Sequence, residues 1–275
     1  MKRLNKKVSK DHHKYKKIKR FFSLTSSEWE SSFFKKKMGL IHTDDAILKA
    51  SKVDQVIQAL KNTIHQGEKE KYNILQLIID SSLYELMLYI LETGFFLVDT
   101  QIIFRTEIVK SLLPVESYLT CRAVNDNDLP EIIKLTHDSF TNNPDFYSRY
   151  KNLKYFTHSQ TKNYYEVRAK NYIYLKNSIS TVCEAFNNLL GFTIISPIGS
   201  INNMQLYKVI LSAVKANYKG KGIYSKLSNY SLNQIPGNTF LLENTTQLNN
   251  IPMLKNYLKL NKSLHKIEYI CYYQF

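Results

Sequence analysis

The stretch that decides the fold is Val209-Ile-Leu-Ser-Ala-Val-Lys-Ala-Asn-Tyr-Lys-Gly-Lys-Gly-Ile-Tyr-Ser-Lys-Leu227. It predicts a strand that runs into a glycine turn, and the turn opens a helix. Gly220 can take a positive φ, and Gly222 lets the backbone pass close to a ligand. Unpaired N–H groups and the positive end of the helix dipole then gather at one point. The stretch therefore predicts a phosphate-binding turn.

The side chains around this turn fit a diphosphate. Three lysines add positive charge, and Ser225 offers a hydroxyl donor. A Gly-x-Gly triplet alone is weak evidence, because such turns end many helices and strands. The apolar residues directly before it favour the strand-turn-helix interpretation. The residues predicted to surround the diphosphate are Asn217, Tyr218, Lys219, Gly220, Lys221, Gly222, Ile223, Ser225 and Lys226.

A second stretch, Thr246-Gln-Leu-Asn-Asn-Ile-Pro-Met-Leu-Lys-Asn-Tyr257, places a tyrosine on a helix shortly after a strand. Asn250, Met253 and Tyr257 follow i, i+3, i+7 spacing, so they share one helical face. A tyrosine has a pKa of about 10 and a thiol of about 8.5. The phenol is therefore protonated at neutral pH and can donate a proton to a leaving thiolate. The competing interpretation is packing, because the chain has 20 tyrosines.

The composition is that of an ordinary globular protein with one large domain or two small ones. The chain has 275 residues, of which 44% are hydrophobic and 22% charged. No apolar run approaches the roughly 18 residues of a membrane span, and the N-terminus lacks the apolar core of a signal peptide. The three cysteines are far apart and form no CxxC pair. This argues against disulfides and a metal cluster, and it favours a cytoplasmic location.

The net charge of +15 is concentrated at the N-terminus. Residues 1–20 hold ten Lys/Arg and one acid, which leaves +6 for the other 255 residues. Such a tail is typical of a nucleic-acid or membrane-surface arm, but also of a disordered solvated extension. We expect the disordered extension, because nothing beyond Phe22 continues a basic stripe.

Hydrophobic periodicity predicts a small α/β region over about 21–115. Helical spacing covers 53–64, a buried strand covers 74–79, and Ser82 is expected to cap a helix that ends at Thr93-Gly94. Residues 95–104 again resemble a strand, so the region contains a βαβ unit. Pro114 is the expected boundary.

The second region, 116–275, predicts a mixed α/β sheet flanked by helices. Strands are expected near 118–123, 180–185, 189–196, 205–214, 239–244 and 264–274. Helices are expected near 126–140, 163–177, 220–232 and 252–260. Asn187-Asn188 and the stretch from Gly199 to Asn203 supply turns.

The glycine turn and the tyrosine helix together resemble the acyl-CoA site of the GCN5-related N-acetyltransferase superfamily, as does the order of elements. The superfamily pattern is Gln or Arg, two residues, Gly, one residue, then Gly or Ala; here Asn217 replaces the Gln or Arg. Met253 likewise stands where Ala is common, and Asn261 stands near the usual helix-closing Gly and can take the left-handed conformation.

This resemblance implies a mechanism and assigns further residues. The strand before the turn would splay from its neighbour and pair with the pantetheine arm through Leu211, Ser212, Ala213 and Val214. A backbone N–H at a bulge, within 211–213, would stabilise the oxyanion. Tyr257 would be the general acid, while Asn250 and Met253 would line the cofactor. The general base is left open between Glu243, His158 and a water chain, and His137 is expected to be structural. Acyl-CoA would be a co-substrate, with no permanently bound cofactor or metal.

A closer resemblance is to the bacterial dTDP-fucosamine acetyltransferases and related N-acyltransferases of nucleotide-linked amino sugars. Three stretches carry it: Ser27-Glu-Trp-Glu-Ser-Ser-Phe-Phe34, Gly94-Phe-Phe-Leu-Val-Asp-Thr-Gln-Ile-Ile-Phe104, and the tyrosine helix. It implies a two-domain homo-oligomer that acylates a dTDP-linked amino-deoxyhexose with acetyl or a short acyl group such as hydroxybutyryl. The sugar would lie near the first two helices of the second region, against Phe146, Tyr147, Tyr164 and Tyr165. For these four aromatic residues packing is an equally valid interpretation.

Three rival functions are consistent with the sequence. One is acylation of a protein or another small-molecule amine. Another is a non-enzymatic nucleic-acid-binding protein that works through residues 1–20, although we expect no nucleic-acid partner. The third is a catalytically silent acyl-CoA sensor.

Overall fold

The computed structural model describes residues 21–110 and 120–275, which fall into two compact units. The small unit contains the described residues up to Ile103, together with Thr246–Leu248 and Leu264–Phe275. The large unit contains the described residues of Phe104–Thr245, together with Asn249–Ser263. The division therefore differs from a linear boundary near 115, because the last strand of the chain returns to the N-terminal unit. The expected basic extension, 1–20, and Pro114 lie outside the described residues.

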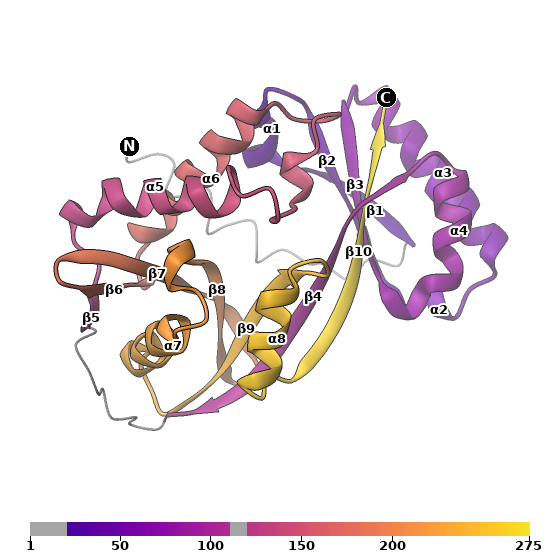
Figure 1. The fold of residues 1–275 in the computed structure, drawn as a ribbon. Coiled ribbons are helices and arrows are strands. Elements are labelled where there is room, and N and C mark those ends of the chain that lie inside the picture. The colour runs from indigo at the N-terminus through magenta and orange to yellow at the C-terminus, as the bar shows by residue number, and fades with distance from the viewer. Residues whose placement is uncertain (1–20, 111–119) are drawn as a thin grey trace. The chain divides into compact units, whose positions relative to one another are not determined.

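The small unit is a sheet with helices packed on it (Figure 1). Its strands run in the order β1-β2-β3-β10-β4, where β2 and β3 are parallel and β10 is antiparallel to β3. The elements are β1 (Phe22–Ser26), α1 (Glu28–Phe34), β2 (Met38–Thr43), α2 (Asp45–Lys49), α3 (Val53–Lys69), β3 (Ile74–Asp80), η1 (Ser81–Leu83), α4 (Tyr84–Glu92), β4 (Phe96–Val109) and β10 (Leu264–Gln274). Strand β4 begins in this unit and continues into the large unit.

Apolar periodicity explains the core of the small unit. Val56 and Leu60 on α3 are fully buried, as are Leu75 and Leu77 on β3. The expected cap at Ser82 is displaced by two residues, because the Asp80 carboxylate accepts the backbone N–H of Ser82 at 2.8 Å. This starts a 3-10 turn before α4. The sequence did not predict β1, α1, β2 and α2, which are short and individually weak in pattern.

The large unit is a mixed sheet with helices on both faces (Figure 1). Its strands run in the order β4-β9-β8-β7-β6-β5, with β8 and β9 parallel and the β5-β6-β7-β8 neighbours antiparallel. The elements after β4 are β5 (Thr120–Ala123), η2 (Asp126–Asp128), α5 (Leu129–Phe140), η3 (Arg149–Lys151), α6 (His158–Ile173), β6 (Ile179–Ala185), β7 (Asn188–Ile201), β8 (Met204–Val214), η4 (Ala216–Tyr218), α7 (Ile223–Gln234), β9 (Thr239–Gln247) and α8 (Ile251–Lys259). The predicted fold class is confirmed.

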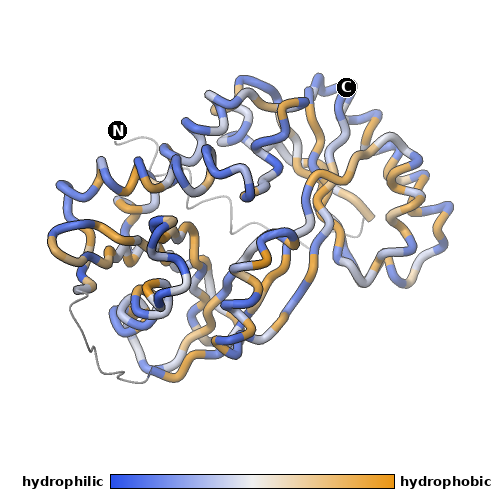
Figure 2. The backbone as a smooth tube through the Cα atoms, viewed as in Figure 1, coloured by the Kyte–Doolittle hydropathy of each residue, from blue (hydrophilic) through white to orange (hydrophobic). Residues whose placement is uncertain are grey.

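Two boundaries in this unit differ from the sequence expectation. Helix α6 begins at His158 rather than 163, because Thr157 and Gln160 form a reciprocal capping box. Strand β7 continues through Gly199, and the turn falls at Asn202-Asn203, both with positive φ. Asn tolerates this conformation better than most residues, so it takes the turn that Gly199 was expected to start. Figure 2 shows the apolar residues following the strands and the inward helix faces.

Candidate functional site

Strand β8 carries a bulge in its pairing with β7. Ile194 lies opposite Leu211 and Ile195 lies opposite Val209, so Ile210 is an extra residue without a partner on β7, all of which the structure describes. A bulge of this kind bends the strand and redirects its backbone groups. The sequence placed the oxyanion donor within 211–213. The bulge lies at Ile210, immediately before that range, and this makes the N–H groups of Ile210 and Leu211 the candidates.

From Val209 onward, just before the bulge, β8 separates from β9. Their parallel register begins with Leu206 opposite Leu241 and ends with Lys208 opposite Glu243. Both strands are described beyond that point, where no further β8–β9 pairs form. The backbone of residues 209–214 is thus open toward β9. Leu211 and Ala213 are buried, and the Ser212 hydroxyl donates to the Phe192 carbonyl at 3.2 Å.

The predicted phosphate-binding turn is exposed and has the expected backbone. Gly220 and Gly222 have φ values of 78° and 76°. In the described part of the chain, no heavy atom outside the glycine and its two chain neighbours lies within 4 Å of the position that a Cβ would take at either glycine. Helix α7 begins directly after Gly222. The backbone N–H of Lys226 donates to the Gly222 carbonyl at 3.1 Å and makes the first hydrogen bond of the helix. The N–H groups of residues 223–225 therefore precede the intrahelical ladder.

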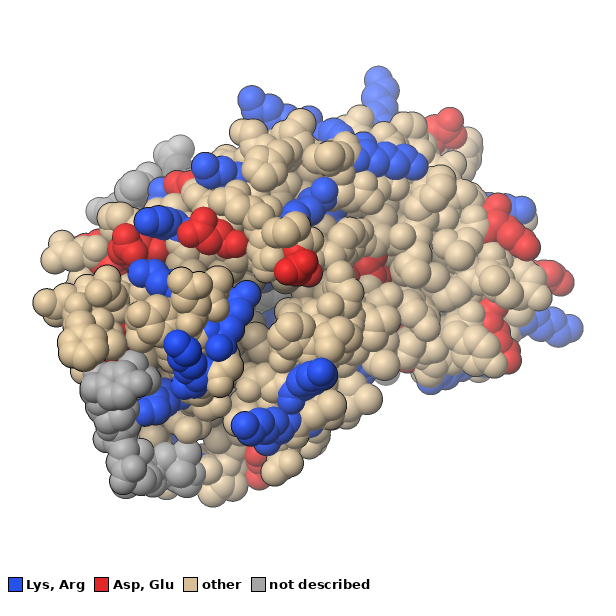
Figure 3. All heavy atoms as spheres, in the orientation of Figure 1, with Lys and Arg blue, Asp and Glu red and all other residues tan. Residues whose placement is uncertain are grey.

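Positive charge surrounds this turn. Figure 3 shows Lys and Arg side chains over α7 and the end of β8 that leads to it. Lys219 and Lys221 are exposed, and the Lys221 ammonium lies 5.0 Å from the Tyr218 ring centroid. Lys215 is paired with Glu131 at 3.4 Å. The turn thus combines exposed cations with aligned backbone donors.

The Tyr257 hydroxyl lies where the two strands separate. Its side chain is 3% exposed and packs edge-on against Phe104, with ring centroids 5.1 Å apart. The phenol is hydrogen-bonded to Tyr224 on α7 and to Asn244, the first β9 residue beyond the parallel register. Burial raises the pKa of Tyr257 to about 12, against the lowering effect of these two bonds. Tyr257 therefore carries its proton throughout the neutral range.

Sequence reasoning missed Tyr224 and Asn244. Asn244 lies two residues after the apolar run Phe240-Leu-Leu on the same strand and is 1% exposed. A polar side chain in a buried strand needs hydrogen-bond partners, and this was the available signal. Tyr224 lies in the first turn after the second glycine, but nothing local distinguished it from the other tyrosines.

Three predicted residues lie at or near α8: Asn250 precedes the helix, Met253 lies within it and Asn261 follows it. The Asn250 carbonyl accepts the N–H groups of Met253 and Leu254, both at 3.0 Å, so Asn250 starts the helix through its backbone. Met253 is half-buried. The interpretation that Asn261 takes the left-handed conformation at the helix end is confirmed, with φ of 51°.

Glu243 is engaged in ion pairs and is a poor general base. Its carboxylate lies 2.8 Å from the Lys208 ammonium and 2.9 Å from the Arg105 guanidinium, and its side chain is 7% exposed. Burial alone would raise the pKa of Glu243, but Lys208 and Arg105 outweigh this and lower it. The pairing therefore indicates a structural role.

The two histidines considered in the sequence lie in different surroundings. His158 is an exposed residue at the start of α6, while His137 lies 3.3 Å from Glu166 and links α5 to α6. Burial lowers the pKa of His137, and the charge of Lys162 adds to this, against the opposing effect of Glu166.

The four aromatic residues predicted to meet a sugar lie mainly in packing contacts. Tyr164 and Tyr165 are buried, at 2% and 5% exposure. The Tyr164 ring lies 4.1 Å from that of Tyr150, and the Tyr165 ring stacks on Phe140 at 5.2 Å. Phe146 packs edge-on against Phe140 and is half-buried, whereas Tyr147 is 36% exposed.

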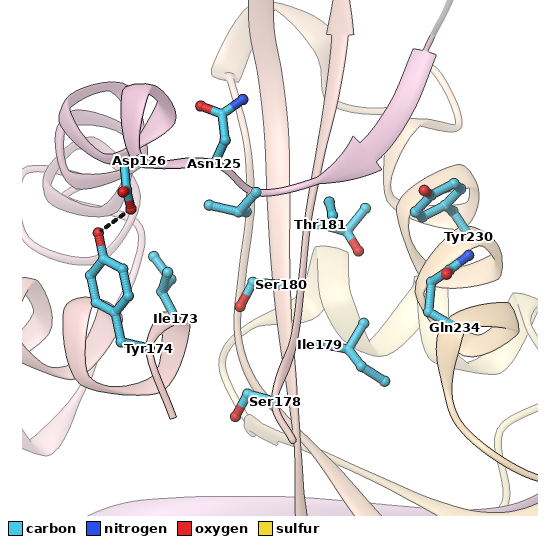
Figure 4. A pocket seen from close by; sticks show the side chains of 12 residues that line it. Asn125, Asp126, Ile173, Tyr174, Ser178, Ile179, Ser180, Thr181, Tyr230 and Gln234 are labelled. Carbon is cyan, nitrogen blue, oxygen red and sulfur yellow. Dashed lines mark hydrogen bonds between the residues drawn. The ribbon is translucent and has the colours of Figure 1, made fainter. Parts of the chain in front are cut away.

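A cavity of about 340 Å³ lies away from all of the predicted ligand residues. In Figure 4, Tyr174 and Asp126 lie on one side of the start of β6, and Tyr230 and Gln234 lie on the other. The Tyr174 hydroxyl donates to Asp126 at 2.9 Å. The cavity is lined by Ala123, Val124, Asn125, Asp126, Ile173, Tyr174, Ser178, Ile179, Ser180, Thr181, Tyr230 and Gln234.

Among the described residues, no group of three or more His, Cys, Asp or Glu side chains is placed to hold a metal ion. Within the same residues, no helix is both long and apolar enough to cross a membrane.

Comparison with known proteins establishes the fold. No protein family model matches the sequence, and no curated protein matches it. A functionally unknown conserved protein from Staphylococcus epidermidis ATCC 12228 is similar in structure, with a TM-score of 0.64, 13% identity, and coverage of 98% of this chain and 96% of that one. A tandem GNAT protein from the clavulanic acid biosynthesis pathway has a TM-score of 0.52 at 12% identity, covering 86% and 75%.

A GCN5-related N-acetyltransferase from Kribbella flavida has a TM-score of 0.51 at 11% identity, covering 86% of this chain and 80% of that one. The chain therefore has the GCN5-related N-acetyltransferase fold, as its sequence pattern predicted. At these identities the likeness concerns the fold.

Proposed function

We propose that this protein transfers an acyl group from acyl-CoA to an amino group. One observation carries the proposal: the bulged strand β8 leaves β9 and runs into an exposed two-glycine turn at the start of α7, with a buried phenol at the separation. The open edge of β8 suits the pantetheine arm, which pairs as an extra strand would. The turn suits the diphosphate. A GCN5-related N-acetyltransferase of known structure has a similar fold, which supports the proposal.

In the proposed reaction the neutral amine nitrogen attacks the thioester carbon and forms the new C–N bond. The backbone N–H groups of Ile210 and Leu211 are the candidates to stabilise the resulting oxyanion. The C–S bond then breaks, and Tyr257 gives its proton to the departing sulfur. Because Glu243 is held by Lys208 and Arg105, a water chain is the proposed route for the amine proton.

For the acceptor we propose a dTDP-linked amino-deoxyhexose, with acetyl or a short acyl such as hydroxybutyryl as the group transferred. The resemblance of three separated stretches to the dTDP-fucosamine acetyltransferases supports this choice, and the partly exposed Tyr147 offers a stacking surface. The protein would act as a homo-oligomer in the cytoplasm. Another small-molecule amine or a protein amine is the alternative acceptor.

The test is release of CoA thiol from acetyl-CoA in the presence of dTDP-linked amino sugars, with the acylated product identified by mass. The matched control is the same nucleotide sugar with a hydroxyl in place of the amine, which should release no thiol. Thiol release with unlinked amino sugars or lysine peptides alone would replace the proposed acceptor. Absence of turnover with every amine would refute the acyltransferase function.

A further inference from the structure

Three polar side chains from three elements meet at the separation of β8 and β9. Tyr224 comes from the first turn of α7, Asn244 from β9 and Tyr257 from α8. The rings of Tyr224 and Tyr257 lie 6.4 Å apart and tilted by 56°. Tyr224 is half-buried, while the other two are almost fully buried. Polar groups in such a place are costly unless they bond to one another.

The Tyr257 hydroxyl is hydrogen-bonded to both of the other side chains. Burial raises the pKa of both phenols; their mutual bond then lowers the pKa of Tyr257 and raises that of Tyr224. In the arrangement that suits an acid, the Tyr224 hydroxyl donates to the Tyr257 oxygen, so that Tyr257 keeps its own proton for the leaving group. Asn244 also lowers the pKa of Tyr257, and its Oδ1 has no hydrogen-bond partner among the described residues, so its amide NH₂ is the donor.

We propose that Tyr224 and Asn244 are positioning residues that make Tyr257 an effective acid. This inference rests on the proposed function. Two donated bonds occupy the lone pairs of the Tyr257 oxygen, so its own proton is turned away from both partners. When that proton leaves, the same two bonds stabilise the phenolate. They act in a site from which water is largely excluded, where fixed donors are most effective.

The test is a double-mutant cycle on the turnover of acyl-CoA and amine. Tyr224→Phe should lower kcat by about 10- to 100-fold, the scale of one hydrogen bond to a developing charge. The KM for acyl-CoA should change little, because the lost bond does not touch the diphosphate turn. In the Tyr257→Phe background the same change should have almost no effect, since its target is gone. Asn244→Leu should behave in the same way.

The matched control is Tyr230→Phe, which removes a hydroxyl from the same helix away from Tyr257. It should leave kcat unchanged. Equal losses from Tyr224→Phe in both backgrounds would show a structural role and overturn the inference, while leaving the proposed function intact. A wild-type protein without turnover on any amine would overturn both.

Two cysteines of the large unit form a second, independent site. Cys121 on β5 lies directly opposite Cys183 on β6. The N–H of Val124 bonds to the Ser180 carbonyl at 2.9 Å, so the 124–180 pair is hydrogen-bonded. Hydrogen-bonded and non-hydrogen-bonded pairs alternate along antiparallel strands. Counting back three positions makes Cys121 and Cys183 a non-hydrogen-bonded pair, whose Cα atoms lie about 4.5 Å apart.

The surroundings suit exchange of the two thiols. Their side chains are in direct contact, and that contact is the main cause that lowers the pKa of Cys121 and raises that of Cys183. The positive charge of Lys226 also favours the Cys121 thiolate. Cys121 is half-buried, whereas Cys183 is fully buried in a cluster with Ile223 and Leu227.

We infer that Cys121 and Cys183 form a cross-strand disulfide by exchange with a low-molecular-weight disulfide. The Cys121 thiolate attacks one sulfur of the reagent, whose disulfide bond breaks to release a thiolate. Cys183 then attacks the Cys121 sulfur of the mixed disulfide after losing its proton, and the second reagent thiolate leaves. Both protein thiols are oxidised and the reagent disulfide is reduced to two thiols. The pair separation lies within the range that disulfide geometry allows.

The test uses the full-length protein and oxidised glutathione. Titratable thiols should fall from the three of the sequence to one, with a Cys121–Cys183 cross-link in the peptide map. Cys271→Ser is the matched control and should still lose both remaining thiols, whereas Cys121→Ser should lose none. A glutathione adduct that persists on Cys121, or an unchanged thiol count, would overturn the inference.

Discussion

Removing the Tyr257 hydroxyl is the perturbation that most directly examines the proposed chemistry. Replacement by Phe keeps the ring contact with Phe104, whose centroid lies 5.1 Å away, and leaves the glycine turn untouched. Turnover should fall by about 10²-fold, the scale of a lost general acid. The affinity for CoA should be unchanged, because the proposed diphosphate contacts lie on another helix.

The same substitution has a cost in stability. It leaves the donors of Tyr224 and Asn244 without their acceptor, at about 1–3 kcal/mol for each group that stays dry. Steady-state kinetics should therefore be measured well below the unfolding midpoint, with CoA affinity determined by calorimetry on the same samples. Turnover equal to that of the wild type, in protein shown to be folded, would refute the assignment of Tyr257 as the acid.

Three further outcomes are expected. Gly222→Ala, at φ of 76°, should cost about 1–2 kcal/mol of stability and weaken CoA binding. The control Gly237→Ala, at φ of 83° outside the turn, should cost as much stability and leave CoA binding intact. Calorimetry measures both affinities. Glu243→Gln should lower the free energy of unfolding by about 2–3 kcal/mol, which is below the range for fully buried pairs because its partners are partly exposed. The folded variant should keep most of its activity. A loss of kcat beyond about 10²-fold would restore Glu243 as a base. The pKa of Tyr257 is raised to about 12, so its contribution to stability is complete below pH 10 and is lost as the pH rises toward 12. In urea unfolding, the stability of Tyr257→Phe should therefore decline less steeply with alkaline pH than that of the wild type. Equal slopes would contradict the raised pKa.

Local features of the chain were predictable because their causes lie within a few residues. Alternation and helical spacing located most strands and helices of the large unit, and the two glycines supplied the positive φ values that the turn requires. The tyrosine helix begins one residue before its expected start. The short elements between Phe22 and Lys49 escaped prediction because each is too brief to show a period.

The position of the bulge could not be read from the strand itself. Ile210 is an ordinary strand residue in an apolar run, and its lack of a partner is a property of the register with β7. Register depends on which faces are buried once both strands are in place. For the same reason the pairing of Cys121 with Cys183 could not be predicted, because the two residues lie 62 positions apart in the sequence.

By itself, the sequence determined the strand-turn-helix that offers backbone donors to a phosphate, and the helix that carries Tyr257. Tertiary structure alone decided what surrounds that tyrosine. It brought Tyr224 and Asn244 to the phenol, and it tied Glu243 to Arg105 across 138 positions. The physical reason is that backbone conformation follows neighbouring residues, whereas hydrogen bonding and charge pairing among buried side chains depend on which strands the sheet places side by side.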